Sequence, residues 1–258
     1  MAALGEIVGF CDELLEIGAF DDYGPNGLQV PGPPGAAGES QVSRVATGVS
    51  ANLETIEAAA ADGAQLLLTH HGLFWEFLPR ALSPQMAARL RALFDAGMSL
   101  AAYHLPLDAN AGIGNNALLC ELLGFERAER FGRGRGSAIG WVGRSAEGTP
   151  VAELTELLAS ELGREPLLQG AGPALVRSIG VVSGAGASEV HAAVALGLDA
   201  MLTGEPAEHA MADATEGAIH FIAAGHYATE TLGIRRLGET VAERFGVEHS
   251  FVDVPNPV

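Results

Sequence analysis

The chain has 258 residues, and its formal net charge of −18 argues against electrostatic binding to nucleic acid or to an anionic membrane. Hydrophobic residues make up 48% of the chain, yet no apolar run reaches the roughly 18 residues of a membrane-spanning helix. The stretch from Met1 to Ala19 holds four acidic side chains and no basic one, which is not typical of a secretory signal or a transit peptide. With only Cys11 and Cys120, both in apolar patterns, we expect core thiols and a cytoplasmic protein.

The N-terminal half reads as helices alternating with short apolar strands. Apolar spacing predicts a helix over residues 4–20, turn formers over 21–27, and a loop over 31–40. Beyond that loop the strands are expected at 42–49, 65–69 and 99–103, and the helices at 53–61, 84–96 and 113–123. This alternation is typical of βαβ units and predicts a largely parallel sheet.

The C-terminal half continues the same alternation after residues 126–137, which are rich in Arg and Gly and form the best candidate boundary. The expected strands are 138–142, 178–182, 200–203, 219–223 and 247–252, and the expected helices are 151–162, 189–196 and 229–245. We therefore predict an α/β fold with two lobes, residues 1–130 and 131–258, whose C-terminal segment packs back on the first lobe.

The chain also nearly repeats itself. Residues 55–69 align with 189–203, and His104 to Asp108 aligns with His226 to Glu230. Each half then has a strand that ends in Thr, followed by a second strand that ends in His-x-x-x-acid. The pattern favours an internal duplication, so that the two lobes would be similar.

The chemically capable residues fall at the ends of predicted strands. His70 and His71 follow one strand, His104 and Asp108 follow the next, and His226 and Glu230 follow a strand of the second half. Ligands of parallel α/β sheets bind beyond the carboxyl ends of the strands, so these groups could converge on one cleft. Imidazole and carboxylate are suitable ligands for zinc, iron or manganese, and we predict a site for two divalent cations.

Structural roles remain open for several of these residues. Asp108 could cap the following helix, and Glu230 could be solvated on the first turn of its helix. Glu205 and His209 fit a site role and a surface role equally well. The other histidines, His191, His220 and His249, are expected to be structural or exposed.

Two glycine-rich segments carry weaker signals. Residues 132–136 lack the ending of a phosphate loop and are better interpreted as a flexible turn. Residues 184–188 follow a strand and open a helix, so their amides could hold an anion. A nucleophile elbow of the Gly-x-Ser-x-Gly type does not occur in the sequence.

Five ordered motifs carry a resemblance to a known family. They are Asn26-Gly27-Leu28-Gln29, Thr69-His70-His71-Gly72-Leu73-Phe74-Trp75, His104-Leu105-Pro106-Leu107-Asp108, Leu202-Thr203-Gly204-Glu205 and Gly225-His226-Tyr227-Ala228-Thr229-Glu230. Together they resemble the Nif-three-like family, also named GTP cyclohydrolase 1 type 2 or dinuclear metal centre hexameric proteins. The chain departs from the commoner family pattern at Glu205, where many members have Asp, and at Leu105-Pro106, where many have Thr-Asn.

The resemblance implies two similar α/β lobes, a homohexamer, and a dinuclear metal centre in the cleft between the lobes. The metal ligands it implies are His70, His71, Asp108, His226 and Glu230, and His104 would lie close to the metals. We expect metal-assisted hydrolysis with His104 as proton shuttle. The family name implies a nucleotide substrate, GTP, opened at its guanine ring. A phosphoester hydrolase or a non-enzymatic, hexameric metal-binding scaffold or regulator are the alternatives.

Overall fold

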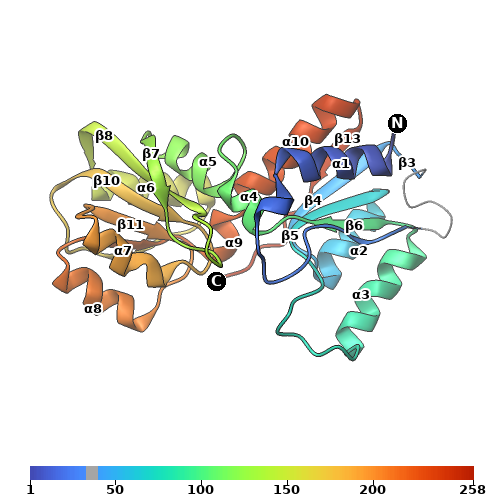
Figure 1. The fold of residues 1–258 in the computed structure, drawn as a ribbon, viewed down its shortest axis with the longest axis horizontal. Helices are drawn as coiled ribbons and strands as arrows, with labels where there is room; N and C mark the ends of the chain where they lie inside the picture. The colour runs from blue at the N-terminus through green and yellow to red at the C-terminus, as the bar shows by residue number, and fades with distance from the viewer. Residues whose placement is uncertain (33–39) are drawn as a thin grey trace. The chain divides into compact units, whose positions relative to one another are not determined.

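The structure is a computed structural model that describes residues 1–32 and 40–258. It divides into two compact units, residues 1–107 with 233–254 and residues 108–232 with 255–258. The chain leaves the first unit within the short helix α4 (Leu105–Ala109) and returns to it within α10 (Thr231–Phe245). Each unit is a sheet with helices on both faces (Figure 1).

The first unit is built on a five-stranded sheet with strand order β13-β4-β5-β6-β2. Its strands are β2 (Gly27–Val30), β4 (Arg44–Ser50), β5 (Leu66–His71), β6 (Ser99–Ala102) and β13 (Glu248–Phe251). Strands β13, β4, β5 and β6 are parallel, and β2 is an antiparallel edge on β6. A separate short pair joins β1 (Ala2–Ala3) to β3 (Gln41–Val42).

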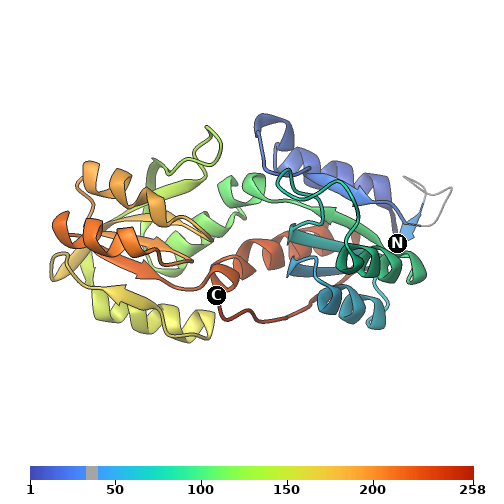
Figure 2. The ribbon, with the colours of Figure 1, turned by 90° about the horizontal axis from the view of Figure 1, so that it is seen from below.

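Helices cover both faces of this first sheet. Helices α1 (Leu4–Leu14) and α10 lie on one face, and α2 (Leu53–Ala61) and α3 (Pro84–Asp95) on the other (Figure 1; Figure 2). Because successive side chains of a strand point to opposite faces, Leu67 packs with Ile56 and Leu93 under α2 and α3. On the other face α1 and α10 meet through Phe10 and Phe245, whose ring centroids are 5.5 Å apart.

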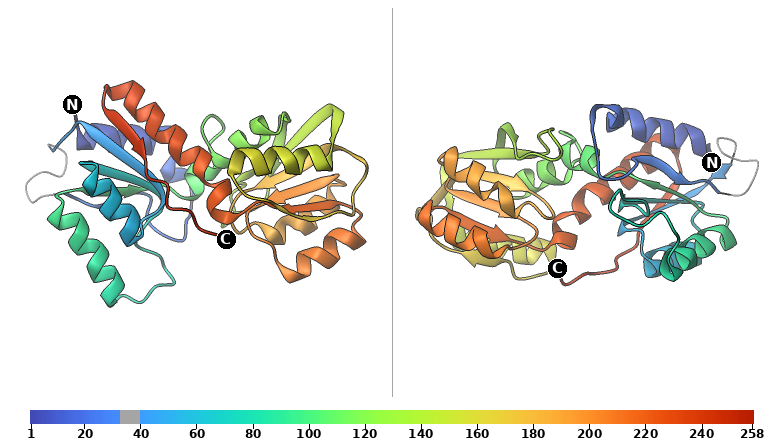
Figure 3. Two further views of the ribbon diagram at one scale, coloured as in Figure 1. Left: turned by 180° about the vertical axis from the view of Figure 1, so that it is seen from behind. Right: turned by 60° about the horizontal axis from the view of Figure 1, so that its bottom comes forward.

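The second unit is built on a six-stranded sheet with strand order β7-β8-β10-β11-β12-β9. Its strands are β7 (Glu126–Phe131), β8 (Gly140–Pro150), β9 (Leu167–Gln169), β10 (Leu175–Val182), β11 (Ala200–Thr203) and β12 (His220–Ala223). Its helices are α5 (Asn115–Leu122), α6 (Val151–Leu162), α7 (Val190–Ala195), α8 (Glu208–Glu216) and α9 (His226–Thr229). A short 3-10 turn occurs in each unit, at Ile17–Ala19 in the first and at Ala187–Glu189 in the second. Helices α5 and α6 pack on one face and α7 and α8 on the other (Figure 1; Figure 3).

The two sheets share an ordered set of strands. In the first unit β4, β5 and β6 run parallel with β2 antiparallel on β6, and in the second β10, β11 and β12 run parallel with β9 antiparallel on β12. The other edges differ, since β13 is parallel to β4 whereas β8 is antiparallel to β10. This common order agrees with the near-repeat in the sequence, and the duplication itself stays a prediction.

The predicted α/β class is confirmed, and the predicted elements mostly coincide with observed ones. The expected helix over residues 4–20 ends earlier, because Glu16 adopts a left-handed conformation with φ 51°. Residues 126–131, expected to lie in a boundary segment, form the edge strand β7. Most of the expected loop over 31–40, residues 33–39, lies outside the described part of the chain.

The compact units divide the chain differently from the predicted lobes of 1–130 and 131–258. Residues 108–130 belong with the second unit because Leu119 and Cys120 of α5 pack against its sheet. Residues 233–254 belong with the first unit because β13 pairs with β4.

Among the described residues, no helix has the length and apolar character needed to cross a membrane.

Candidate metal-binding site

Three histidines meet at the carboxyl ends of β5 and β6 in the first unit. His70 and His71 are the last two residues of β5, and His104 follows β6 by two residues. Their ring centroids are separated by 4.7 Å (His70 to His71), 5.1 Å (His70 to His104) and 5.6 Å (His71 to His104). One ligand nitrogen of each ring lies within 4.8 Å of the others, so this group could hold a metal ion.

Each of these rings is held through its Nδ1 atom. Nδ1 of His70 is 2.9 Å from the carbonyl oxygen of Tyr103, and Nδ1 of His71 is 3.0 Å from Oγ of Ser50. Nδ1 of His104 is 2.7 Å from Oδ1 of Asp22. A hydrogen bond at one nitrogen fixes the orientation of the ring and makes the other, Nε2, the atom suited to a metal.

The Asn26 to Gln29 motif supports this cluster from the neighbouring edge strand. Oδ1 of Asn26 accepts from the backbone N–H of His104 at 2.8 Å, and its Nδ2 donates to Asp22 at 2.9 Å. Oε1 of Gln29 accepts from the N–H of Leu73 at 2.8 Å. A Cβ at position 72 would overlap the Gln29 amide, so the glycine after the two histidines allows the close approach of Gln29. The motif therefore fixes the backbone on both sides of the histidine cluster.

Asp22 is a site residue that the sequence did not reveal, since it reads there as one of several turn formers. Its side chain is 2% exposed, and it accepts hydrogen bonds from His104, Asn26 and the backbone N–H groups of Tyr23 and Leu105. Burial alone would raise the pKa of this carboxyl, but the hydrogen bond and charge of His104 and the other donors lower it below its ordinary value. Asp22 is therefore a charged, buried anchor for His104.

The second unit brings Asp108, His226 and Glu230 together with two supporting residues. Oδ1 of Asp108 accepts from Nδ2 of Asn115 at 2.8 Å and from Oγ of Ser183 at 3.0 Å. A carboxylate oxygen of Asp108 lies within 4.8 Å of one of Glu230, and Oε1 of Glu230 is 3.2 Å from Nε2 of His226. Asp108 and Glu230 are both buried. The structure thus places these three predicted ligands in one cluster of the second unit.

His226 lies between two carboxylates. Its Nδ1 is 2.5 Å from Oε1 of Glu205, and its Nε2 faces Glu230. Burial opposes a charge on the ring, but the hydrogen bonds and negative charges of Glu230 and Glu205 raise the pKa of His226 to about 9. Glu205, for which the sequence left site and surface roles open, therefore orients a predicted ligand.

The sequence allows an anion to bind at the backbone amides of the glycine-rich segment 184–188. In the structure the amides of Gly184 and Gly186 donate to side chains of the protein instead. The N–H of Gly184 donates to Oγ1 of Thr229 at 3.1 Å, and the N–H of Gly186 donates to Oγ1 of Thr203 at 3.0 Å. Gly184 has φ +61°, and a Cβ there would overlap Oε1 of Glu230. The segment instead leaves room for the Glu230 carboxylate.

The remaining histidines lie apart from these clusters. His191 and His209 stack on each other with centroids 6.2 Å apart, and His191 also contacts Asp213. His220 is bonded to the carbonyl oxygen of Pro173, and His249 to Thr47.

The two cysteines are not available as metal ligands. Cys11 and Cys120 are both buried, and burial raises the pKa of each thiol to about 12, so both stay protonated at neutral pH.

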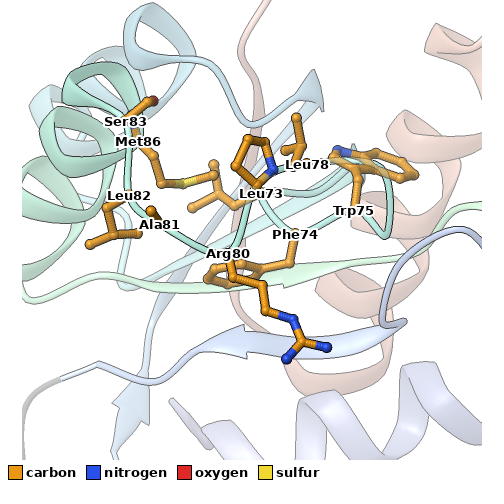
Figure 4. A pocket seen from close by; sticks show the side chains of 10 residues that line it. Leu73, Phe74, Trp75, Leu78, Arg80, Ala81, Leu82, Ser83 and Met86 are labelled. Carbon is orange, nitrogen blue, oxygen red and sulfur yellow. The ribbon is translucent and has the colours of Figure 1, made fainter.

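An apolar pocket of about 310 Å³ lies beside the histidine cluster, within the segment that follows β5 (Figure 4). Side chains of Leu73, Leu78, Leu82 and Met86 line it together with the indole of Trp75. Trp75 also contacts His104 edge-on, with centroids 5.1 Å apart, and stacks on Phe77 at 5.7 Å. An aromatic surface therefore adjoins the histidines.

The donor set suits divalent cations of the first transition series. Imidazole nitrogen and carboxylate oxygen are ligands of zinc, iron and manganese. Each imidazole ring already has a hydrogen-bond partner at Nδ1 that orients it. The three-histidine group of the first unit presents such donors at strand ends. In the second unit Glu230 lies close to both Asp108 and His226. The chain is therefore an α/β protein with His, Asp and Glu groups that could hold metal ions.

Comparison with known proteins identifies the family. The model of the Duf34/NIF3 (NGG1p interacting factor 3) family matches residues 2–257, and the chain belongs to this family. A relative from Pseudomonas aeruginosa named "GTP cyclohydrolase 1 type 2 homolog" is 40% identical over 255 residues, which are 99% of this chain and 98% of the relative. A relative of the same name from Pyrococcus horikoshii is 40% identical and covers 97% of each chain.

Solved structures show the same fold. The protein ybgI, described as of unknown function, is similar with a TM-score of 0.90 and 35% identity over 98% of each chain. A protein from Thermus thermophilus has a TM-score of 0.86 and 32% identity, again over 98% of each chain. The predicted family resemblance is confirmed.

We expect Gly184→Ala to displace the Glu230 carboxylate, because the added Cβ overlaps Oε1. Gly197→Ala is the matched control, since Gly197 has a similar φ of +63° and no atom within 4 Å of its Cβ position. Metal content after loading with Zn²⁺ or Mn²⁺ should fall in Gly184→Ala and not in Gly197→Ala. Equal metal content in the two variants would show that Glu230 needs no such space.

The metal-free protein should lose stability as the pH rises from about 6.5 to about 9. A histidine whose folded pKa lies above its unfolded value stabilises the fold below the unfolded pKa, and this contribution disappears as the pH passes the folded value. The free energy of unfolding should fall by at most about 3 kcal/mol over this range. The measurement is Tm as a function of pH in the presence of a chelator. His226→Gln should flatten this pH dependence. If the slope is unchanged in that variant, another group is responsible.

Proposed function

We propose that the protein is a metal-dependent hydrolase with two divalent cations held by His70, His71, Asp108, His226 and Glu230. The main support is that His70 and His71 are each hydrogen-bonded through Nδ1. Nε2 of each ring is then the atom that would bind a metal. The second unit supports the proposal, since its carboxylates lie close together beside a histidine backed by Glu205. Divalent ions bound there would supply a Lewis acid and activate water near neutral pH.

We propose His104 as the residue that moves the proton in this reaction. Its ring belongs to the three-histidine group and contacts both neighbouring rings, yet it is not among the five proposed ligands. General acid–base catalysis by a positioned imidazole contributes about 10²- to 10⁴-fold to a rate.

We further propose a nucleotide as substrate, opened at its guanine ring with release of the imidazole carbon as formate. The relatives' name, GTP cyclohydrolase 1 type 2 homolog, and the aromatic surface of Trp75 beside His104 support this choice. The negative surface, with a net charge of −18, makes binding of such an anion depend on the metals and local arginines. Assembly as a cytoplasmic homohexamer is part of the same proposal.

The test is turnover by metal-loaded protein with GTP and other nucleotides, with formate and phosphate as the measured products. His71→Ala should lower turnover at least 10²-fold and reduce the metal content. His191→Ala is the matched control, because that ring is exposed and lies outside the cluster. Phosphate without formate would favour the phosphoester hydrolase. Metal binding without any turnover would favour the non-enzymatic metal-binding protein.

Trp75→Ala should weaken nucleotide binding, because stacking of a base on an aromatic ring contributes about 1–3 kcal/mol, or roughly 5- to 150-fold in affinity. Phe94→Ala serves as control, since Phe94 is an exposed aromatic residue of the same unit that does not line the pocket. Binding is measured by titration with a non-hydrolysable GTP analogue. Equal affinities in the two variants would remove Trp75 from the proposed binding surface.

A further inference from the structure

Hydrogen bonds reach both carboxylate oxygens of Asp22. Oδ1 accepts from Nδ1 of His104 at 2.7 Å and from the N–H of Tyr23 at 2.7 Å. Oδ2 accepts from the N–H of Leu105 and from Nδ2 of Asn26, both at 2.9 Å. The carboxylate is therefore surrounded by donors and bridges the turn before β2 to the residues after β6.

The partner of His104 determines where the proton sits on the ring. An ionised carboxylate only accepts hydrogen bonds, so the contact to Asp22 requires a proton on Nδ1. In the neutral ring the lone pair is then on Nε2, the nitrogen on the side away from Asp22.

We infer that Asp22 is a positioning residue that holds neutral His104 in the Nδ1–H tautomer, so that Nε2 accepts the proton of the attacking water. This inference rests on the proposed hydrolase function. In the step, an O–H bond of water breaks and its proton forms a bond to Nε2. The oxygen electron pair forms a bond to the imidazole carbon of the guanine, while the π pair of the C=N bond at that carbon moves to the ring nitrogen. The imidazolium that results keeps its Nδ1–H against the Asp22 carboxylate, which stabilises the positive charge.

The position of the ring does not depend on Asp22 alone. The backbone N–H of His104 is bonded to Asn26, and the ring packs edge-on against Trp75 at 5.1 Å and against Tyr23 at 6.3 Å. Removing the negative charge of Asp22 should therefore change the tautomer while the ring stays in place.

Asp22→Asn separates these two effects. The amide oxygen is expected to face the donors of Leu105 and Asn26, since the opposite orientation would set its NH₂ group against both of them. The favoured orientation sets the NH₂ group against one backbone donor, the N–H of Tyr23. The NH₂ group then faces Nδ1 of His104, which must accept, and the ring proton moves to Nε2. The variant loses the lone pair at the nitrogen where the proposed step needs it.

The experiment compares the metal-free wild type and Asp22→Asn by ¹⁵N NMR of labelled histidines, recorded as a pH series. Disappearance of a signal in His104→Gln assigns the residue. We expect Nδ1–H in the wild type and Nε2–H in the variant. The same tautomer in both proteins would overturn the inference.

Kinetics of the loaded protein provide the second readout. With GTP, kcat of Asp22→Asn should fall about 10²- to 10⁴-fold with little change in KM, and adding Asp22→Asn to His104→Gln should cost nothing more. Asp21→Asn, at the exposed neighbouring position, is the control for loss of one negative charge. An additional loss in the double variant would mean that Asp22 acts through the fold, and would overturn its role in positioning His104.

The two proposals fail in different ways. If the wild type has no turnover but the tautomer changes in Asp22→Asn, the hydrolase function is wrong and the control of His104 by Asp22 stands. If the wild type turns over GTP and Asp22→Asn does so equally well, the hydrolase stands and the positioning role is wrong.

Discussion

Parallel pairing of β5 with β6 is the constraint on which the histidine cluster depends. The register aligns Leu66 with Ser99 and Thr69 with Ala102, so both strands end at the same edge of the sheet. The backbone N–H of Tyr103 continues the ladder to Thr69, and the carbonyl oxygen of Tyr103 then receives Nδ1 of His70. The same backbone hydrogen bonds that pair β5 with β6 thus place the carbonyl group that orients His70.

A similar solution occurs in the second unit with different residues. His226 follows β12 as His104 follows β6, and each ring has a carboxylate at Nδ1, Glu205 in one case and Asp22 in the other. The carboxylates come from different places in the two units, since Asp22 precedes the edge strand whereas Glu205 follows β11. Shared strand order places the histidine after its strand in each unit, and carboxylates from different parts of the two units hold the rings.

The supporting polar groups also explain why small residues lie beside these clusters. Gly72 allows the close approach of the Gln29 amide, and Gly184 allows that of the Glu230 carboxylate. Buried polar side chains need nearly complete hydrogen bonding, because a buried group without a partner costs about 1–3 kcal/mol. A carboxylate such as Asp22 can therefore be buried only where several hydrogen-bond donors converge.

The sequence by itself determined the α/β class, most of the strands and helices, and the family, because apolar periodicity and ordered motifs are local properties of the chain. It also pointed to His70, His71, His104, Asp108, His226 and Glu230, since each follows an expected strand. Only the tertiary structure decided which atoms hold these rings. Asp22 lies 82 residues from His104 along the chain, and Ser50 lies 21 from His71. Such partners have no local signal, because a turn aspartate or a strand serine looks the same in sequence until the sheet brings it to a histidine.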